Sequence, residues 1–313
     1  MNTEKNEASI NRVGVIDIGT LKTKFVIAEF DENKGRKIII RDKKITNLGK
    51  GLNSGSRIIN PESLSLQQDV LVSMMQTMEA LNVNAYSVIG TEALRNAENA
   101  SEVIDLINTT VHQDLEILDQ EQEARLFFEV VSRSISNQDL ATVDIGGGSV
   151  QLCIGKDQNM RELHLLKTGT LSLQLGDVNS NSGIIQNENS WQFVKSVVSE
   201  LNLSPMGNAY LVYGSTNILD FFSVANIGNE VSYLGEEHSR IASIEELIQI
   251  YNRITRLERN EREKFFPNDP QFMWGVDKGL INVANICEAL GITEVIPTNL
   301  NLSDGILLKL SGN

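Results

Sequence analysis

Short apolar runs alternate with longer amphipathic stretches along most of the chain, and this pattern predicts a mixture of strands and helices. The short runs are bounded by Gly, Asp and Asn, which favour turns. They cover residues 13–16, 25–30, 37–40, 44–48, 85–89, 115–118 and 209–213, with a strand, turn and strand over 140–154. The first four runs predict an antiparallel meander that opens an α/β lobe.

The intervening segments carry apolar residues at helical spacing. Asn60 with Pro61 indicates a helix start, and Asn99 with Glu102 fits a capping pair. Three helices are expected directly after Asn60, Asn99 and Asp119. A further helix begins at Ser243, where Ser243 and Glu246 form a capping box, and runs to Ile254. The other expected helices cover residues 190–201, 283–290 and 303–310. The polar stretch 258–269 is predicted to be a solvated linker.

Length and charge narrow the class of protein. The 313 residues exceed a typical domain, so we expect two lobes with a cleft between them. A formal net charge of −14 disfavours nucleic acid and anionic membranes as partners. Residues 1–11 are polar and no apolar run approaches the ~20 residues of a membrane span, so we expect a soluble, cytoplasmic protein.

The cysteines and histidines do not suggest a metal centre. Cys153 and Cys287 lie in apolar patterns, which predicts buried thiols rather than a disulfide or zinc ligands. The three histidines, His112, His164 and His238, are scattered without ligand spacing, so we expect structural or surface roles.

One phrase occurs twice, as Asp17-Ile18-Gly19-Thr20 and as Asp144-Ile145-Gly146-Gly147-Gly148-Ser149. In each copy a carboxylate ends an apolar run, and glycine then lets the backbone turn with its N–H groups directed at an anion. A single copy would be read as an ordinary hairpin turn. Two copies in matching contexts favour a phosphate-binding device that is built twice.

These phrases, together with residues 90–95, 122–126 and 213–216, resemble in order the exopolyphosphatase/guanosine pentaphosphate phosphohydrolase (Ppx/GppA) family. The resemblance implies an α/β fold with two ribonuclease-H-like (actin-like) lobes, mixed sheets flanked by helices and an interlobe cleft. It places the first lobe at 1–120, completed by 300–313, and the second at 121–299. It also implies hydrolysis of a terminal phosphoanhydride in polyphosphate or guanosine pentaphosphate, with Mg²⁺ or another divalent cation, and a possible homodimer.

Roles follow from the resemblance position by position. Glu123 takes the place of the catalytic glutamate that deprotonates water, and Asp144 that of a catalytic and metal-binding carboxylate. Asp17 would also hold metal, with Gln151 as a weak further ligand. The residues implied in phosphate binding are Gly19, Thr20, Lys24, Arg95, Gly146, Gly147, Gly148, Ser149, Gly214, Ser215 and Thr216.

Departures from the family pattern leave other functions open. Gln151 stands where the family has a second acid, and an arginine usual near residues 171–173 is absent. A binding or regulatory protein that has lost efficient hydrolysis is therefore one alternative. The series from Asp17 to Lys24 also resembles the phosphate loop of actin-like kinases, although a lone lysine is more often a solvent-facing strand residue.

Overall fold

The computed structural model describes residues 11–31, 35–50, 52, 57–174 and 188–312. The chain forms two compact units, of which unit 1 contains residues 1–122 with 303–313 and unit 2 contains residues 123–302. Residues 1–10, which belong to the polar N-terminal segment, lie outside the described residues. Among the helices that the structure describes, none is both long enough and apolar enough to cross a membrane.

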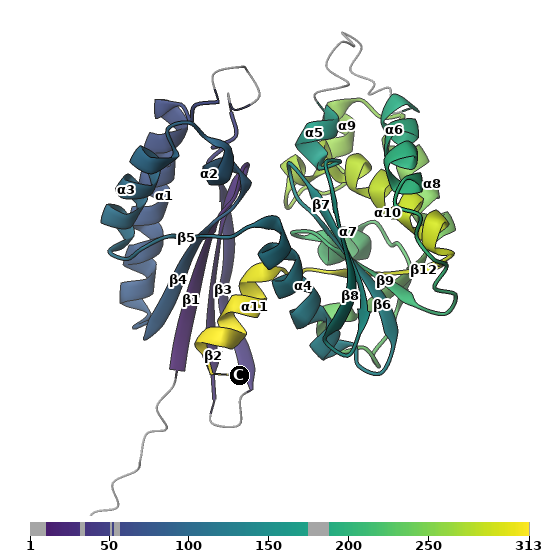
Figure 1. The fold of residues 1–313 in the computed structure, drawn as a ribbon, viewed down its shortest axis with the longest axis horizontal. Helices are drawn as coiled ribbons and strands as arrows, with labels where there is room; N and C mark the ends of the chain where they lie inside the picture. Colours follow the sequence, from purple (N-terminus) through teal and green to yellow (C-terminus); the bar gives the residue numbers. More distant parts are fainter. Residues whose placement is uncertain (1–10, 32–34, 51, 53–56, 175–187, 313) are drawn as a thin grey trace, which may run out of the picture. The chain divides into compact units, whose positions relative to one another are not determined.

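Unit 1 contains a mixed five-stranded sheet with the order β3-β2-β1-β4-β5 (Figure 1). Its antiparallel part is β1 (Asn11–Ile18), β2 (Lys22–Phe30) and β3 (Arg36–Ile45), and its parallel part adds β4 (Ala85–Gly90) and β5 (Glu116–Ile117). The sequence predicted two strands, at residues 37–40 and 44–48, where the structure has the single continuous strand β3. The polar residues 41–43 between the predicted strands pair regularly with β2, because β3 is an edge strand of the sheet.

One face of this sheet packs against α1 (Pro61–Ala80) and α3 (Ala100–Val111). Asn60 caps α1 as predicted, with its side chain accepting a hydrogen bond from the Ser63 N–H at 2.9 Å. Met74 and Met78 of α1 are buried in the apolar core, which confirms the expected amphipathic face. The capping role predicted for Asn99 is wrong, because its amide instead pairs with both backbone groups of Ile59.

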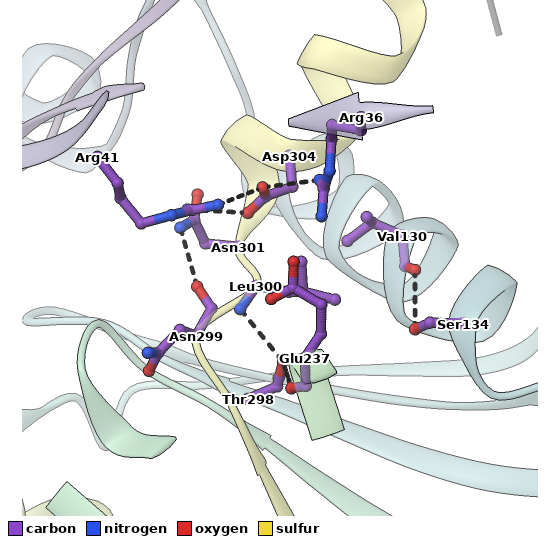
Figure 2. Close-up of polar contacts among 10 residues, drawn as sticks. All are labelled: Arg36, Arg41, Val130, Ser134, Glu237, Thr298, Asn299, Leu300, Asn301 and Asp304. Atoms are coloured by element: carbon purple, nitrogen blue, oxygen red, sulfur yellow. Dashed lines mark hydrogen bonds and ion pairs between the residues drawn. The ribbon is translucent and has the colours of Figure 1, made fainter. Parts of the chain in front are cut away.

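The C-terminal helix α11 (Leu302–Leu310) is tied to β3 by a buried carboxylate. Asp304 is fully buried and accepts from Arg36 at 3.0 Å and from Arg41 at 2.6 Å (Figure 2). Arg41 lies opposite Val26 in the sheet register. Side chains alternate along a strand, so α11 covers the sheet face opposite to the one that packs against α1 and α3.

Unit 2 contains a seven-stranded mixed sheet with the order β10-β11-β12-β9-β6-β7-β8. Its strands are β6 (Asp139–Ile145), β7 (Val150–Lys156), β8 (Asn159–Leu166), β9 (Tyr210–Gly214), β10 (Asn229–Glu230), β11 (Arg240–Ser243) and β12 (Glu294–Thr298). Strands β6, β9 and β12 are parallel, so their carboxyl ends meet at one edge of the sheet.

Helices surround this second sheet (Figure 1). They are α4 (Gln120–Ser134), α5 (Thr170–Gln174), α6 (Glu188–Ser199), α7 (Ile218–Val224), α8 (Ile244–Ile254), α9 (Arg259–Glu263) and α10 (Val276–Leu290). The core on one sheet face includes Val194, Leu247 and Val283 from α6, α8 and α10. The capping box of Ser243 and Glu246 is confirmed at the start of α8.

The segment predicted as a solvated linker is structured. Residues 259–263 form α9, and Glu258 caps it together with Glu261. Arg262 is buried and forms an ion pair of 3.1 Å with buried Asp277 of α10. The linker prediction was wrong because a charged residue was read as solvated, whereas its partner lies on a helix much later in the chain.

Candidate active site

The two copies of the repeated phrase form hairpins with the same register. Asp17 of β1 lies opposite Lys24 of β2, and Asp144 of β6 lies opposite Gln151 of β7. In both hairpins the first loop glycine donates its N–H to the carbonyl three residues later, at 3.0 Å for Gly19 to Lys22 and for Gly146 to Ser149. The repeat in sequence is therefore a repeat in structure, and Lys24 and Gln151 occupy equivalent positions.

The turn in each hairpin requires close approach of the backbone. A Cβ added to Gly19 would lie 2.9 Å from the Lys22 carbonyl oxygen, and one added to Gly146 would lie 3.3 Å from that of Ser149. Gly169, just before α5, lies so close to residues 147–149 that any side chain would collide with their backbone. These contacts explain why residues 19, 146 and 169 are glycine.

Helix α4 lies on the sheet face that carries Asp144. Thr142 and Asp144 of β6 point to the same face as their cross-strand partners Cys153 and Gln151. The Cys153 thiol donates to the carbonyl oxygen of Ala124 in α4 at 3.7 Å. The first turn of α4 is thereby placed over this face.

A second contact fixes the same helix one turn further along. Gly214, at the end of β9, lies opposite Asp144, and a Cβ on Gly214 would collide with the ring of Phe127. Phe127 follows Glu123 by four residues, so the two side chains lie on one face of α4. Glu123 therefore belongs to the helix face that packs toward the sheet face carrying Asp144.

The start of α4 is held by reciprocal hydrogen bonds between Asp119 and Gln122. The Gln122 N–H donates to the Asp119 carboxylate, and the Asp119 N–H donates to the Gln122 side chain, both at 2.8 Å. The helix expected to follow Asp119 is confirmed, and the Asp119 side chain caps it. Glu123 lies in the first turn with only 9% of its surface exposed, where the positive end of the helix dipole stabilises its carboxylate.

The parallel strands bring a further predicted segment to the same sheet edge. Gly214 is the last residue of β9, whose carboxyl end lies beside that of β6, and Ser215 and Thr216 follow it. Buried Gln151 donates its side-chain N–H to the hydroxyl of Ser149 at 3.1 Å. Unit 2 thus gathers Glu123, Asp144, the 146–149 loop, Gln151 and the 214–216 turn around one face and edge of its sheet.

Unit 1 carries the remaining predicted site residues. Lys24 forms an ion pair of 3.2 Å with Asp17, whose surface is 2% exposed. Thr20 lies at the hairpin turn, where its carbonyl accepts from the Gly49 N–H at 2.8 Å. Arg95, on α2 (Glu92–Asn96), donates to the carbonyl of Leu118 at the end of β5. That these residues face those of unit 2 across a cleft stays a prediction.

The carboxylates of Asp17 and Asp144 fit a divalent cation that is coordinated partly by substrate phosphate better than a cation that is coordinated by protein ligands alone. Among the described residues there is no cluster of three or more His, Cys, Asp or Glu that could hold a metal ion. Mg²⁺ is commonly held by one or two carboxylates together with substrate phosphates and water. Asp144, with the amide oxygen of Gln151 opposite, fits that limited demand, whereas Lys24 already supplies positive charge at Asp17.

Burial has strong effects on several titratable groups. It raises the pKa of the Cys153 and Cys287 thiols to about 12, so both are buried neutral thiols, as predicted. It also raises the pKa of Tyr213, which the negative charges of Asp144 and Asp277 raise further. Desolvation lowers the pKa of His238, which is fully buried, to about 4, which supports a structural role for that histidine.

Comparison with known proteins places this fold in a defined class. A crystal structure of the Aquifex aeolicus member of the Ppx/GppA protein family aligns over 97% of this chain and 99% of its own, with 21% identity and a TM-score of 0.80. The crystal structure of an exopolyphosphatase from Cytophaga hutchinsonii aligns over 96% and 98%, with 18% identity and a TM-score of 0.78. The fold is that of Ppx/GppA phosphatases, with two actin-like α/β lobes.

The sequence itself gives the family. The model of the Ppx/GppA phosphatase family matches residues 26–313, and the chain belongs to this family. A guanosine-5'-triphosphate,3'-diphosphate pyrophosphatase from Aliivibrio fischeri is 28% identical over 131 residues, which are 42% of this chain and 26% of that protein. The chain thus aligns with about a quarter of the length of this curated relative.

Two contributors to the site were not foreseen in the sequence. Phe127 falls within the helix expected after Asp119 without a role in the site, and Ser172 falls within residues 171–173, where an arginine usual in the family is absent. The helical spacing of Phe127 and Glu123 is a signal that could have linked them. For Ser172 no local signal exists, because its partners lie in a loop more than twenty positions earlier.

Proposed function

We propose that the protein hydrolyses the terminal phosphoanhydride bond of inorganic polyphosphate or guanosine pentaphosphate. Family membership supports a phosphatase, and one structural observation carries the assignment to this site. That observation is the packing of Phe127 on Gly214, the residue that pairs with Asp144. This contact turns the helix face that includes Glu123 toward the sheet face that carries Asp144. The Glu123 and Asp144 carboxylates, which the proposal assigns as proton acceptor and oxygen ligand, thus belong to one sheet face beside a glycine loop.

In the proposed reaction, water attacks the terminal phosphorus atom as the bond from phosphorus to the bridging oxygen breaks. Glu123 accepts the proton of the attacking water, since a carboxylate in a protected helix start can serve as general base. Backbone N–H groups of the 146–149 loop stabilise charge on the phosphoryl oxygens. Orthophosphate and the shortened chain, or guanosine tetraphosphate, are the products.

Mg²⁺ or another divalent cation would be held by Asp144 and by the phosphate oxygens, with Gln151 contributing a neutral oxygen. When bound, such an ion neutralises phosphate charge and helps to align the leaving group. Asp144 would also orient the phosphate end relative to Glu123. The phosphate-binding roles of Lys24 and Arg95 in unit 1 stay predictions of the family resemblance.

Phosphate release from both substrates tests this proposal. The purified full chain is assayed with polyphosphate and with guanosine pentaphosphate, each with Mg²⁺ and with a chelator. We expect Mg²⁺-dependent release of orthophosphate from at least one substrate. Absence of release from both, in a protein that is folded by circular dichroism, would contradict the proposal.

Gln151 supports a second candidate, a phosphate-binding regulatory protein with weakened hydrolysis. Its buried amide takes the place opposite Asp144 and donates to Ser149, and an amide cannot act as a base. This candidate predicts saturable binding of polyphosphate or guanosine pentaphosphate without release of orthophosphate. Equilibrium binding measured beside the hydrolysis assay distinguishes the two functions.

A further inference from the structure

The carbonyl groups of Gly146, Gly147 and Gly148 are all held by one short segment, residues 170–172. The Gly146 carbonyl accepts the Thr170 N–H at 3.0 Å, and the Gly147 carbonyl accepts the Ser172 N–H at 3.3 Å. The Gly148 carbonyl accepts the Ser172 hydroxyl at 2.9 Å. Three successive peptide groups are thus fixed from the side on which α5 lies.

Peptide geometry sets the direction of the opposite groups. In a trans peptide the C=O of one residue and the N–H of the next point in nearly opposite directions. With three carbonyls held toward α5, the N–H groups of Gly147, Gly148 and Ser149 point away from it. Among the described residues, no acceptor is assigned to these three N–H groups. Such a row of donors binds an anion.

We infer that Ser172 is a positioning residue for phosphate binding, and that it acts by orienting the peptide between Gly148 and Ser149. Its hydroxyl makes the third of the three anchoring contacts, and it is the one contact of the three that depends on a side chain alone. The backbone contacts of Thr170 and Ser172 would persist in a variant that lacks the hydroxyl. This inference rests on the proposed function for the identity of the anion, a terminal phosphoryl group.

The adjacent contacts define how much freedom the loop retains. Gly169 packs directly against the backbone of residues 147–149, so the loop cannot move toward α5. Without the Ser172 hydroxyl, the peptide after Gly148 could still rotate. We therefore expect loss of one oriented donor, with the hairpin and the fold retained.

The inference is tested by measuring the binding of tripolyphosphate to the full chain in the presence of a chelator. Binding is monitored by the backbone amide resonances of the protein. In the wild type, tripolyphosphate is expected to shift the amide resonances of Gly147, Gly148 and Ser149. Removal of one hydrogen bond in Ser172→Ala should raise the Kd about fivefold, and Ser172→Thr, which keeps the hydroxyl, should restore binding. Ser199→Ala is the matched control, because Ser199 is an exposed serine that donates to a helix carbonyl at 2.8 Å outside the site.

The possible outcomes separate this inference from the proposed function. Unchanged Kd in Ser172→Ala, or no shift of the three amides in the wild type, would overturn the positioning role. Binding that depends on Ser172 in a protein that releases no orthophosphate would support the inference and contradict hydrolysis. In an active protein, Ser172→Ala should raise KM more than it lowers kcat, because the loop binds the same phosphoryl group before and during the reaction.

Discussion

Phe127 lies directly over Gly214, and no side chain at residue 214 could share that space. This contact joins α4 to β9 at the strand position that pairs with Asp144. Because Glu123 lies one helical turn before Phe127, the contact also determines where the proposed base is held. The glycine that the family resemblance assigns to a phosphate-binding turn therefore has a packing role as well.

Gly214→Ala should displace the Phe127 ring. We expect a loss of about 2 kcal/mol in the free energy of unfolding from overpacking, and a lower kcat because the Glu123 helix shifts. Urea unfolding and phosphate-release kinetics measure the two effects. The double variant Gly214→Ala/Phe127→Leu should recover part of both losses, and strictly additive losses would show that the contact does not couple the two residues.

Gln151→Glu should increase the affinity for Mg²⁺. A carboxylate opposite Asp144 supplies a harder, charged oxygen ligand than an amide does. We expect the Mg²⁺ concentration for half-maximal phosphate release, or for half-maximal tripolyphosphate binding, to fall several-fold. Gln158→Glu, on the exposed turn between β7 and β8, is the control for added charge. An equal response in both variants would argue against a cation at Asp144.

His238 should make stability depend on pH in the acidic range. Its folded-state pKa is lowered to about 4 from an ordinary value of 6.5, so the unfolded chain binds the proton more readily between these values. The contribution of neutral His238 is therefore complete above about pH 6.5 and is lost as the pH falls toward about 4, by about 3 kcal/mol in total.

Urea unfolding of the wild type and of His238→Asn across this range tests the assignment. The variant should lose most of the acid-dependent slope, whereas His112→Asn, at an exposed helix end, should retain it. A wild-type slope that persists in His238→Asn would assign the acid sensitivity to other groups.

Asp304→Asn should weaken the attachment of α11 to β3. The buried carboxylate accepts from two arginines, and a neutral amide cannot replace both charge-assisted hydrogen bonds (Figure 2). We expect a loss of about 2 kcal/mol in the free energy of unfolding. Asp42→Asn, at an exposed ion pair with Lys44, should change it by less than about 0.5 kcal/mol. Similar effects of the two substitutions would contradict the importance assigned to burial.

The sequence predicts those features of the fold that depend on neighbouring residues. The Ser243–Glu246 capping box and the Asp119 cap each involve groups three positions apart, so local chemistry determines them. Alternation and glycine turns likewise predicted the hairpins at 13–30 and 140–154. The resemblance then supplied the family, which the match over residues 26–313 establishes.

Features that depend on distant partners could not be predicted in this way. From the sequence, Arg262 is predicted to be solvated, whereas in the fold it pairs with Asp277. Asn99 is likewise predicted to cap a helix, whereas its amide forms hydrogen bonds with the backbone of Ile59. Ser172 becomes relevant only when its hydroxyl is seen on the Gly148 carbonyl. Each of these contacts joins segments that the fold alone brings together.

Phosphate release by Glu123→Gln, compared with Glu121→Gln on the exposed side of the same helix turn, tests the central claim most directly. Both variants lose one carboxylate from the start of α4, but of the two residues only Glu123 is buried, on the helix face that packs toward the sheet face carrying Asp144. We predict that Glu123→Gln lowers kcat by about 100-fold or more while tripolyphosphate binding is retained, and that Glu121→Gln remains near wild type. Wild-type turnover in Glu123→Gln would contradict the assignment of this residue as the base.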